Sequence, residues 1–535
     1  MQDKRDSEKS RLQEEQELFQ QLVQKGKRGF LRAIFGRTTV IAVLLVLQVL
    51  LLLLYFHTLE KYVPLYLGGM TTVAAAMLIY LLNTPGDPTV KLTWAFLIAL
   101  SPVPGTLFYW FVQMDVGHRR EQRVLAQMEQ EAKDYYPDQS ALMNRLKKQD
   151  PTLYQLASYM GKYGGFPVYE HTAVKYFLLG EDKFAELLVQ LRKAERFIFL
   201  EYFAIDKGEL WTELLELLTD KARQGVEVRL LYDGTCSISA LPHDYPQQLA
   251  RLGIQCKPFA PIRPLVTTLY NNRDHRKICV IDGKVGFTGG VNLADEYINR
   301  KVVYGHWKDT AVMLQGEAVT SLTLLFLQMW NATEAQRAYA PYLLPPEENR
   351  VDSPGYVLPY GDSPLDDELV GEMVYRDILN RAKDYVYIMT PYLILDHEMI
   401  TALSYAAKRG VEVKLILPHI PDKPYAFVLA KSHYKELTRA GVQIYEYTPG
   451  FVHAKVFLSD DSRAVVGTIN LDYRSLYLHF ECAAYLQDVP AIGDIKADFC
   501  DTLAKCQPVT PETIQKEKLS VRMAGALLKV IAPLM

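Results

Sequence analysis

Residues 272–292 read NRDHRKICVIDGKVGFTGGVN, and residues 449–470 read PGFVHAKVFLSDDSRAVVGTIN. Both stretches carry the pattern H-x-K-x4-D in a strand-like apolar run, followed by a glycine-containing turn that ends at an asparagine. A single H-x-K match recurs by chance, whereas two copies in the same local setting indicate a shared purpose. The sequence therefore predicts one active site built from two halves. The matching positions are His275, Lys277, Asp282 and Asn292 in the first copy and His453, Lys455, Asp460 and Asn470 in the second.

The repeat extends upstream of both motifs. ARQGVEVRLLYD (222–233) matches AKRGVEVKLILP (407–418), and ERFIFLEYFAI (195–205) matches KDYVYIMTPYLI (383–394). Each step, RQGVEV (223–228) and KRGVEV (408–413), indicates a helix that ends at a glycine cap and is followed by a buried strand. Alternating strands and amphipathic helices predict an α/β fold. We expect two tandem domains related by a pseudo-two-fold axis, with the active site at the seam between them.

Composition narrows the function. The 535 residues contain 59 Lys and Arg against 62 Asp and Glu, a formal net charge of −3. A protein whose main partner is nucleic acid needs a basic surface, so we expect no nucleic-acid partner. The six cysteines form no C-x-x-C pair, which favours ordinary thiols over a disulfide framework or a zinc site.

The N-terminal part is predicted to be membrane-bound. A charged segment of cytoplasmic type (1–37) precedes a transmembrane region (38–114) with apolar runs at about 38–56, 62–82 and 92–113. Each run approaches the ~20 residues that cross a bilayer core. The basic residues before residue 38 favour a cytoplasmic N-terminus. The arginines after the third run favour a cytoplasmic location for the chain that follows it as well. Three full crossings cannot satisfy both signals, so it stays open whether 38–56 spans.

The rest of the chain divides at composition changes. We expect a helical connector over 115–160, a first domain over 161–345, a linker rich in Pro and acids over 346–356 and a second domain over 357–515. A C-terminal amphipathic helix is predicted over 516–535. It lies either on the membrane surface or against the catalytic body.

The motif side chains suit a phosphodiester. In a strand, residues i and i+2 share a face, so each histidine projects together with its lysine. The lysines supply positive charge to phosphate oxygens, and the two asparagines can donate amide hydrogen bonds. One neutral histidine can attack phosphorus while the other, protonated, gives its proton to the leaving oxygen. This chemistry requires no metal or cofactor. Asp282 and Asp460 belong to the motif, but each begins a turn, which favours structural support.

These motifs resemble those of the phospholipase D superfamily, and more specifically of bacterial cardiolipin synthases. The resemblance also rests on HWKDT (306–310), on LLNTPGDPTVKLTWAFLIALSPVPGTLFYWF (81–111) and on the final APLM. It implies mixed sheets flanked by helices and a multi-pass protein of a bacterial cell membrane. It leaves open a homo-oligomer.

The activity that the resemblance implies is phosphatidyl transfer between two phosphatidylglycerol molecules, giving cardiolipin and glycerol without a cofactor. His275 would be the nucleophile and His453 the acid and then the base. Glu481 would orient His275, and Asp309 would orient His453.

Two positions depart from the family pattern. Thr468 stands where serine is common, and His479 stands where asparagine is usual, two residues before Glu481. A phospholipase D-type hydrolase, or a transferase that exchanges headgroups of other phospholipids, remains an alternative because the same phosphatidyl-enzyme serves all of these reactions. The membrane segment and the near-neutral charge oppose a nuclease. The intact motifs in both halves oppose an inactive scaffold.

Overall fold

The computed structural model describes residues 63–113, 118–236, 240–261, 272–366 and 368–534. The predicted N-terminal segment 1–37 and the first apolar run 38–56 lie outside these residues. All six cysteines are free thiols, as the sequence predicted.

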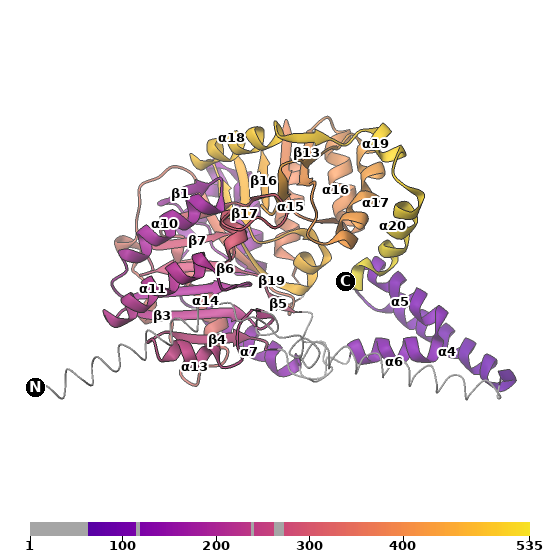
Figure 1. The fold of residues 1–535 in the computed structure, drawn as a ribbon, viewed down its shortest axis with the longest axis horizontal. Coiled ribbons are helices and arrows are strands. Elements are labelled where there is room, and N and C mark those ends of the chain that lie inside the picture. Colours follow the sequence, from indigo (N-terminus) through magenta and orange to yellow (C-terminus); the bar gives the residue numbers. More distant parts are fainter. Residues whose placement is uncertain (1–62, 114–117, 237–239, 262–271, 367, 535) are drawn as a thin grey trace, which may run out of the picture.

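Two sheets built to the same plan form the centre of the molecule (Figure 1). In both sheets four antiparallel pairings are followed by two parallel ones, so the seven strands from β1 to β4 correspond in order to the strands from β10 to β14. The second sheet has one further strand, β20, which pairs antiparallel with β14. This correspondence confirms the predicted α/β repeat. The first order is β1 (Thr172–Phe177), β9 (Ala311–Gly316), β7 (Val285–Gly289), β6 (Lys277–Ile281), β2 (Phe197–Tyr202), β3 (Glu227–Asp233) and β4 (Gln255–Phe259). The second is β10 (Tyr356–Asp362), β19 (His479–Gln487), β17 (Arg463–Gly467), β16 (Val456–Ser459), β11 (Tyr385–Met389), β13 (Glu412–Pro418), β14 (Gln443–Tyr447) and β20 (Cys506–Pro508).

Helices cover the sheets in equivalent positions. Gly225 and Gly410 have φ of 91° and 96°, so each ends a helix in the left-handed conformation that glycine tolerates. Three helices of the first half share one apolar core with the first sheet, and three helices of the second half share another with the second sheet. These helices are α10 (Gly180–Arg192), α11 (Glu209–Arg223) and α13 (Tyr245–Ala250), then α15 (Val370–Arg381), α16 (His397–Lys408) and α17 (Pro424–Ala440).

A third core joins the halves. It contains side chains of α14 (Val319–Asn331), α18 (Ala491–Leu503) and strands of both sheets. The helix that follows each domain's last central strand packs against the first strand of the other domain, α14 on β10 and α18 on β1. The two halves are therefore interleaved rather than merely adjacent.

The N-terminal helices differ from the prediction. The run predicted as one span over 92–113 is instead two helices, α5 (Pro88–Leu100) and α6 (Pro102–Gln113), which pack on α4 (Val63–Asn83). Pro102 lacks an amide hydrogen and disfavours helical geometry at Ser101, which has φ −146° and ψ 83°. With 13 and 12 residues, α5 and α6 reach only about 20 and 18 Å. Among the described residues, no helix combines the length and apolar character needed to cross a membrane.

We call α4, α5 and α6 together the hairpin. In the sequence, three further helices follow it before the first sheet: α7 (His118–Lys133), α8 (Ser140–Gln149) and α9 (Pro151–Tyr159). The segment was predicted as a helical connector. The side chains of α8 and α9 join the core of the second half, because Leu146, Leu153 and Leu156 pack there.

Short strands cross between the halves just before each motif. β5 (Arg273–Asp274) pairs in parallel with the start of β19, and β15 (Gly450–Val452) pairs in parallel with β8 (His306–Lys308). Each H-x-K motif therefore enters its own sheet from a strand that is paired with the opposite half.

Candidate active site

His275 is held by the second half. Its backbone N–H donates to the Phe480 carbonyl at 2.9 Å, continuing the pairing of β5 with β19. Its ring Nδ1 lies 2.9 Å from both carboxylate oxygens of Glu481. Glu481 is fully buried, and the Thr468 hydroxyl donates to its second oxygen. A carboxylate on Nδ1 fixes the ring and leaves Nε2 as the nitrogen available for chemistry.

His453 repeats this arrangement with the first half. Its backbone N–H donates to the Lys308 carbonyl at 2.7 Å, and its Nδ1 lies 2.7 Å from an Asp309 oxygen. Asp309 is fully buried and follows β8 directly. The structure thus brings both predicted carboxylates to the predicted histidines, each across the seam between the domains.

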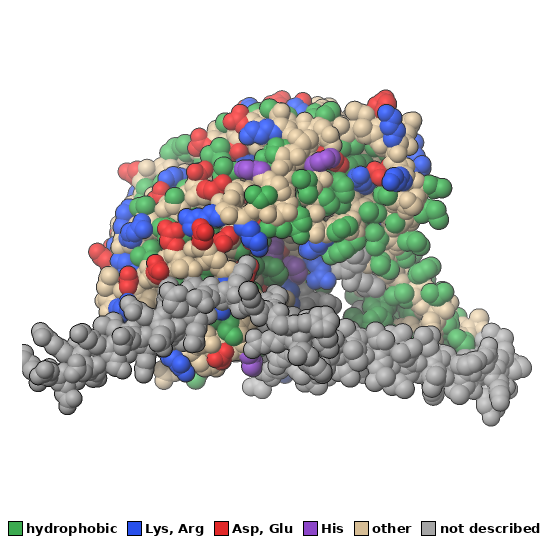
Figure 2. Space-filling view, in the orientation of Figure 1, with side chains coloured by type: hydrophobic (Ala, Val, Ile, Leu, Met, Phe, Trp, Pro, Cys, Tyr) green, Lys and Arg blue, Asp and Glu red, His purple; other side chains and the backbone are tan. Residues whose placement is uncertain are grey.

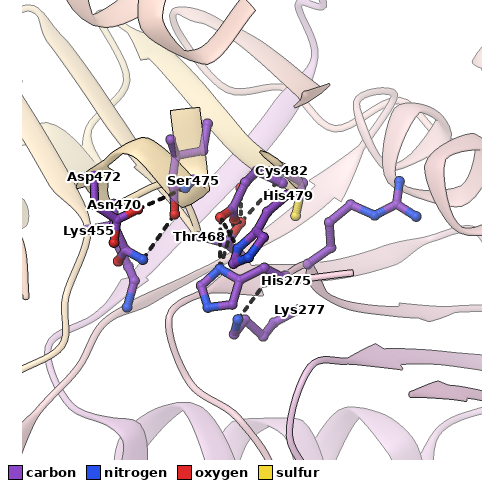
Figure 3. A network of polar contacts seen from close by, with 12 residues as sticks. His275, Lys277, Lys455, Thr468, Asn470, Asp472, Ser475, His479 and Cys482 are labelled. Carbon is purple, nitrogen blue, oxygen red and sulfur yellow. Dashed lines mark hydrogen bonds and ion pairs between the residues drawn. The ribbon is translucent and has the colours of Figure 1, made fainter. Parts of the chain in front are cut away.

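The two lysines lie beside the histidines. Lys277 donates to the His275 carbonyl at 2.5 Å (Figure 3). Lys455 lies 2.9 Å from Nδ1 of His453. The charge of Lys277 acts on both His453 and Lys455, so the two motifs share one electrostatic environment. Burial lowers the pKa of Lys277 to about 8 and that of Lys455 to about 7.

Burial also sets the protonation of the imidazoles. It lowers the pKa of His275 well below its usual value, against the opposing effect of Glu481. Burial and the neighbouring Lys455 lower the pKa of His453 to about 4, although Asp309 acts in the other direction. Burial alone would raise the pKa of Glu481, but its interactions with His275 and His479 outweigh burial, and the net pKa falls. The lowered pKa values of His275 and His453 favour neutral imidazoles near neutral pH.

The two asparagines are already engaged. The Asn292 side chain accepts from the Ala204 backbone at 3.0 Å and donates to the Tyr297 hydroxyl at 2.9 Å. Asn470 donates to the Ser475 hydroxyl at 3.0 Å, while its buried carbonyl oxygen has no hydrogen-bond partner among the described residues. Both asparagines stay near the motifs, but their amide hydrogens order neighbouring loops in this unliganded site.

Asp282 and Asp460 lie away from the imidazoles. Each begins the hairpin turn at the far end of its strand, with φ of 55° and 53°. Seven residues of extended chain separate His275 from Asp282, roughly 20 Å. Asp282 accepts from three successive backbone amides just before β2, at 2.8 Å each. Asp460 does the same before β11, at 2.9 to 3.0 Å. This geometry matches the structural-support reading of the two aspartates.

Aromatic rings also line the site, and the motif analysis did not identify them. The Phe203 ring stands edge-on to His275 at 5.0 Å between centroids, and Lys277 lies 5.3 Å from the same ring. Tyr297 and Trp307 flank His453 at 5.3 and 5.5 Å. Tyr297 could have been found from its spacing, because it stands five residues after Asn292 as Ser475 stands five residues after Asn470.

Comparison with known proteins places this geometry in a family. Residues 187–330 and 375–503, half of the chain, match the family described as "Cardiolipin synthase, PLD-like domain". The chain belongs to this family. A cardiolipin synthase of Geobacillus sp. (strain WCH70) is 32% identical over 507 residues, 93% of this chain and 100% of that relative. An uncharacterized protein of Streptococcus mutans is 53% identical over 457 residues, 85% of this chain and 99% of its own length.

A solved structure shares the fold. The crystal structure of phosphatidylserine synthase from Haemophilus influenzae aligns with a TM-score of 0.54 at 15% identity, covering 71% of this chain and 98% of that chain. The likeness supports the assignment of the paired α/β domains to the phospholipase D-like fold.

A third histidine, His479, lies beside His275 and Glu481. His479 is 9% exposed, and neither of its ring nitrogens has a hydrogen-bond partner among the described residues. Its ring lies 5.5 Å from that of His275, and its Nδ1 is 3.8 Å from Glu481 (Figure 3). His275, His479 and Glu481 could together offer three ligand atoms to a metal, all within 4.8 Å of one another. The ammonium group of Lys277 beside them opposes an added cation.

Proposed function

We propose that this protein is a cardiolipin synthase that transfers a phosphatidyl group from one phosphatidylglycerol to another. The observation that carries the proposal is the pair of buried histidines, each held through Nδ1 by a carboxylate from the opposite domain. The family match extends over both motifs. Lys277 and Lys455 supply the positive charge that a phosphodiester needs.

In the first step, Nε2 of His275 attacks phosphorus and the bond to the glycerol oxygen breaks. His453, protonated when the anionic lipid enters, gives its proton to that oxygen, and glycerol leaves. The phosphate's negative charge raises the pKa of His453, which supports proton uptake together with substrate binding. Glu481 stabilises the positive charge that develops on His275.

In the second step, the hydroxyl of a second phosphatidylglycerol attacks the phosphatidyl-histidine. His453, now neutral, takes the hydroxyl proton, the P–N bond breaks, and cardiolipin leaves with His275 restored. If water takes the place of this hydroxyl the product is phosphatidic acid, and if another alcohol does so the headgroup is exchanged. These outcomes are the alternative reactions of the same intermediate.

We place this chemistry at a bacterial cell membrane. Figure 2 shows hydrophobic side chains gathered over the end of the molecule that carries the hairpin α4–α6 and the C-terminal helix. On the hairpin, Leu82, Leu92 and Leu100 are each at least 70% exposed. Leaving such side chains in water is costly, which favours contact between this end and lipid. The multi-pass arrangement depends on residues 38–56 and stays a prediction.

An assay with phosphatidylglycerol alone tests the reaction. The purified protein in lipid vesicles, without nucleotide or added metal, should form cardiolipin and equimolar glycerol. Phosphatidic acid with glycerol would instead establish the hydrolase. With the phosphorus labelled, an acid-labile phosphatidyl adduct should be detectable in His453→Ala, where its formation and its breakdown are both slowed, and should be absent in His275→Ala. The reverse pattern would exchange the roles of the two histidines.

A further inference from the structure

A large cavity lies outside the active site. It has a volume of about 660 Å³ and opens between α17, α19 (Pro511–Gln515), α20 (Leu519–Ile531) and the last two strands of the second sheet, β14 and β20. We call it the α17–α20 cavity. Sites for small ligands commonly measure about 300–1,000 Å³. None of the motif residues or their carboxylate partners lines it.

The walls of the α17–α20 cavity combine apolar and cationic side chains. Val428, Ile514 and Val521 supply apolar surface. The ionised side chains in the lining give five positive against two negative charges. These are Lys431, Lys435, Arg439, Arg522 and Lys529, and Glu446 and Glu517.

Both acidic side chains already bind partners within the protein. Glu517 pairs with Lys431 at 2.8 Å, and Glu446 binds His419 at 2.9 Å and the Tyr434 hydroxyl at 3.2 Å. Lys435, Arg439 and Arg522, by contrast, form no ion pair with a carboxylate in the part of the chain that the structure describes. The cavity therefore presents unneutralised positive charge next to apolar walls, which suits an anionic amphiphile.

The position of α20 indicates where such a ligand comes from. α20 packs closely on α17, since a Cβ added at Gly525 would lie 3.2 Å from Ser432 and 3.3 Å from the Val428 carbonyl. The sequence left open whether the C-terminal helix lies on the membrane surface or against the body of the protein, and in the structure α20 packs on α17. Its opposite side still carries an exposed stripe at helical spacing. The stripe consists of Leu519 (68% exposed), Met523 (59%), Leu527 (71%) and Ile531 (40%).

This stripe continues into the hairpin. Thr93 of α5 donates to the Val530 carbonyl of α20 at 2.7 Å, and the chain end lies beside α5 (Figure 1). The apolar stripe of α20 and the exposed apolar side chains of the hairpin thus lie at the same end of the molecule (Figure 2). A lipid that leaves this surface meets the α17–α20 cavity on the other side of a single helix.

We propose that the α17–α20 cavity is a second lipid site, which binds one anionic phospholipid taken from the membrane. Arg439, Arg522 and Lys435 hold the phosphate at the mouth of the cavity, and the acyl chain lies along Val428 and Val521. The site is separate from the catalytic one, and its existence does not depend on the reaction that the enzyme performs.

Binding stoichiometry tests the proposal. We would use full-length His275→Ala protein, which cannot turn substrate over, and titrate it with dihexanoyl phosphatidylglycerol in a calorimeter. Two molecules should bind per chain. With Arg439→Gln and Arg522→Gln added, one should remain and the other should weaken by about 10- to 100-fold, the effect of losing charged hydrogen bonds. The matched control is Lys383→Gln with Lys408→Gln, two exposed cations of the same domain outside the cavity.

Two further probes separate the ligand classes. Dihexanoyl phosphatidylcholine and inorganic phosphate should not occupy the second site. Equal binding of phosphatidylcholine would overturn the requirement for an anionic lipid, and equal binding of phosphate would replace the lipid by a free anion. Ala526→Trp, which fills the cavity without changing charge, should also remove the second molecule. If every variant bound only one molecule of dihexanoyl phosphatidylglycerol, the proposed second site would be refuted. If the wild type showed no turnover, only the proposed synthase activity would be contradicted.

Discussion

The two halves share a strand order but differ in what lies behind their catalytic strands. In the first half, Arg276 is buried in ion pairs with Glu201 at 2.5 Å and Asp274 at 3.3 Å. The corresponding positions of the second half are all buried and apolar, namely Ala454, Met389 and Val452. Both halves therefore keep the histidine, the lysine and a carboxylate from across the seam, although the core beneath them differs.

The halves also support their carboxylates differently. Glu481 is long enough to reach His275 while its second oxygen accepts from Thr468. Asp309 is one methylene shorter and lies against Gly290, where a Cβ would come within 2.0 Å of its oxygen. The longer acid, Glu481, thus has the Thr468 hydroxyl beside it, whereas the shorter acid, Asp309, has the backbone of Gly290 beside it.

The largest expected effect tests whether both halves are needed for chemistry. His275→Ala and His453→Ala should each lower cardiolipin formation by about 10³-fold or more, because each removes a group that reacts or transfers a proton. Turnover is measured in vesicles, with vesicle binding and thermal unfolding as controls that should not change. Near-normal turnover in either variant would refute the two-histidine mechanism.

The next largest effect is on stability, and it tests the difference between the ion pairs of Arg276 and the apolar core at the corresponding positions of the second half. Arg276→Ala should destabilise the protein by about 3–5 kcal/mol, because it leaves Glu201 buried without its partner. The triple variant Glu201→Met, Asp274→Val, Arg276→Ala copies the second half and should restore the melting temperature to near or above that of the wild type. A triple variant no more stable than Arg276→Ala would show that the first half depends on its ion pairs.

Exchanging the carboxylates sharpens the comparison at the site itself. Glu481→Gln and Asp309→Asn should each reduce kcat by about 10- to 100-fold, since each removes the charge that orients and stabilises an imidazole. Glu481→Asp and Asp309→Glu keep the charge but lose the fit to Thr468 and to Gly290. Both should therefore fall between the wild type and the amides. Full activity in either exchange would mean that length is not matched to the pocket.

The smallest effect is a change in pH profile. The pKa of Lys455 is lowered to about 7 and that of Lys277 to about 8, so their positive charges are lost as pH rises through these values. We expect kcat/KM for phosphatidylglycerol to fall above about pH 7–8. In Lys455→Arg, whose guanidinium keeps its charge, the part of this fall due to Lys455 should disappear. An unchanged profile would assign the fall to another group.

The site was predicted from sequence more fully than the architecture that assembles it. The paired motifs identified the histidines and lysines, and the family resemblance supplied Glu481 and Asp309. The strands that bring them together, Arg273–Asp274 and Gly450–Val452, are too short to show any periodicity. The break at Ser101 was missed because an apolar run was read as one helix across Pro102 and Pro104. The engaged amides of Asn292 and Asn470 depend on loop contacts that spacing alone does not reveal.

The crossing of β5 to β19 has a consequence for how the protein is made. Arg273 pairs with His479, which is synthesised 206 residues later (479 − 273). At translation rates of about 5–20 residues per second, His275 waits roughly 10–40 s on the ribosome before Glu481 exists to orient it. Until then the growing chain carries the first motif without its carboxylate partner. If the proposed mechanism holds, lipid cleavage starts only when nearly the whole polypeptide has been made.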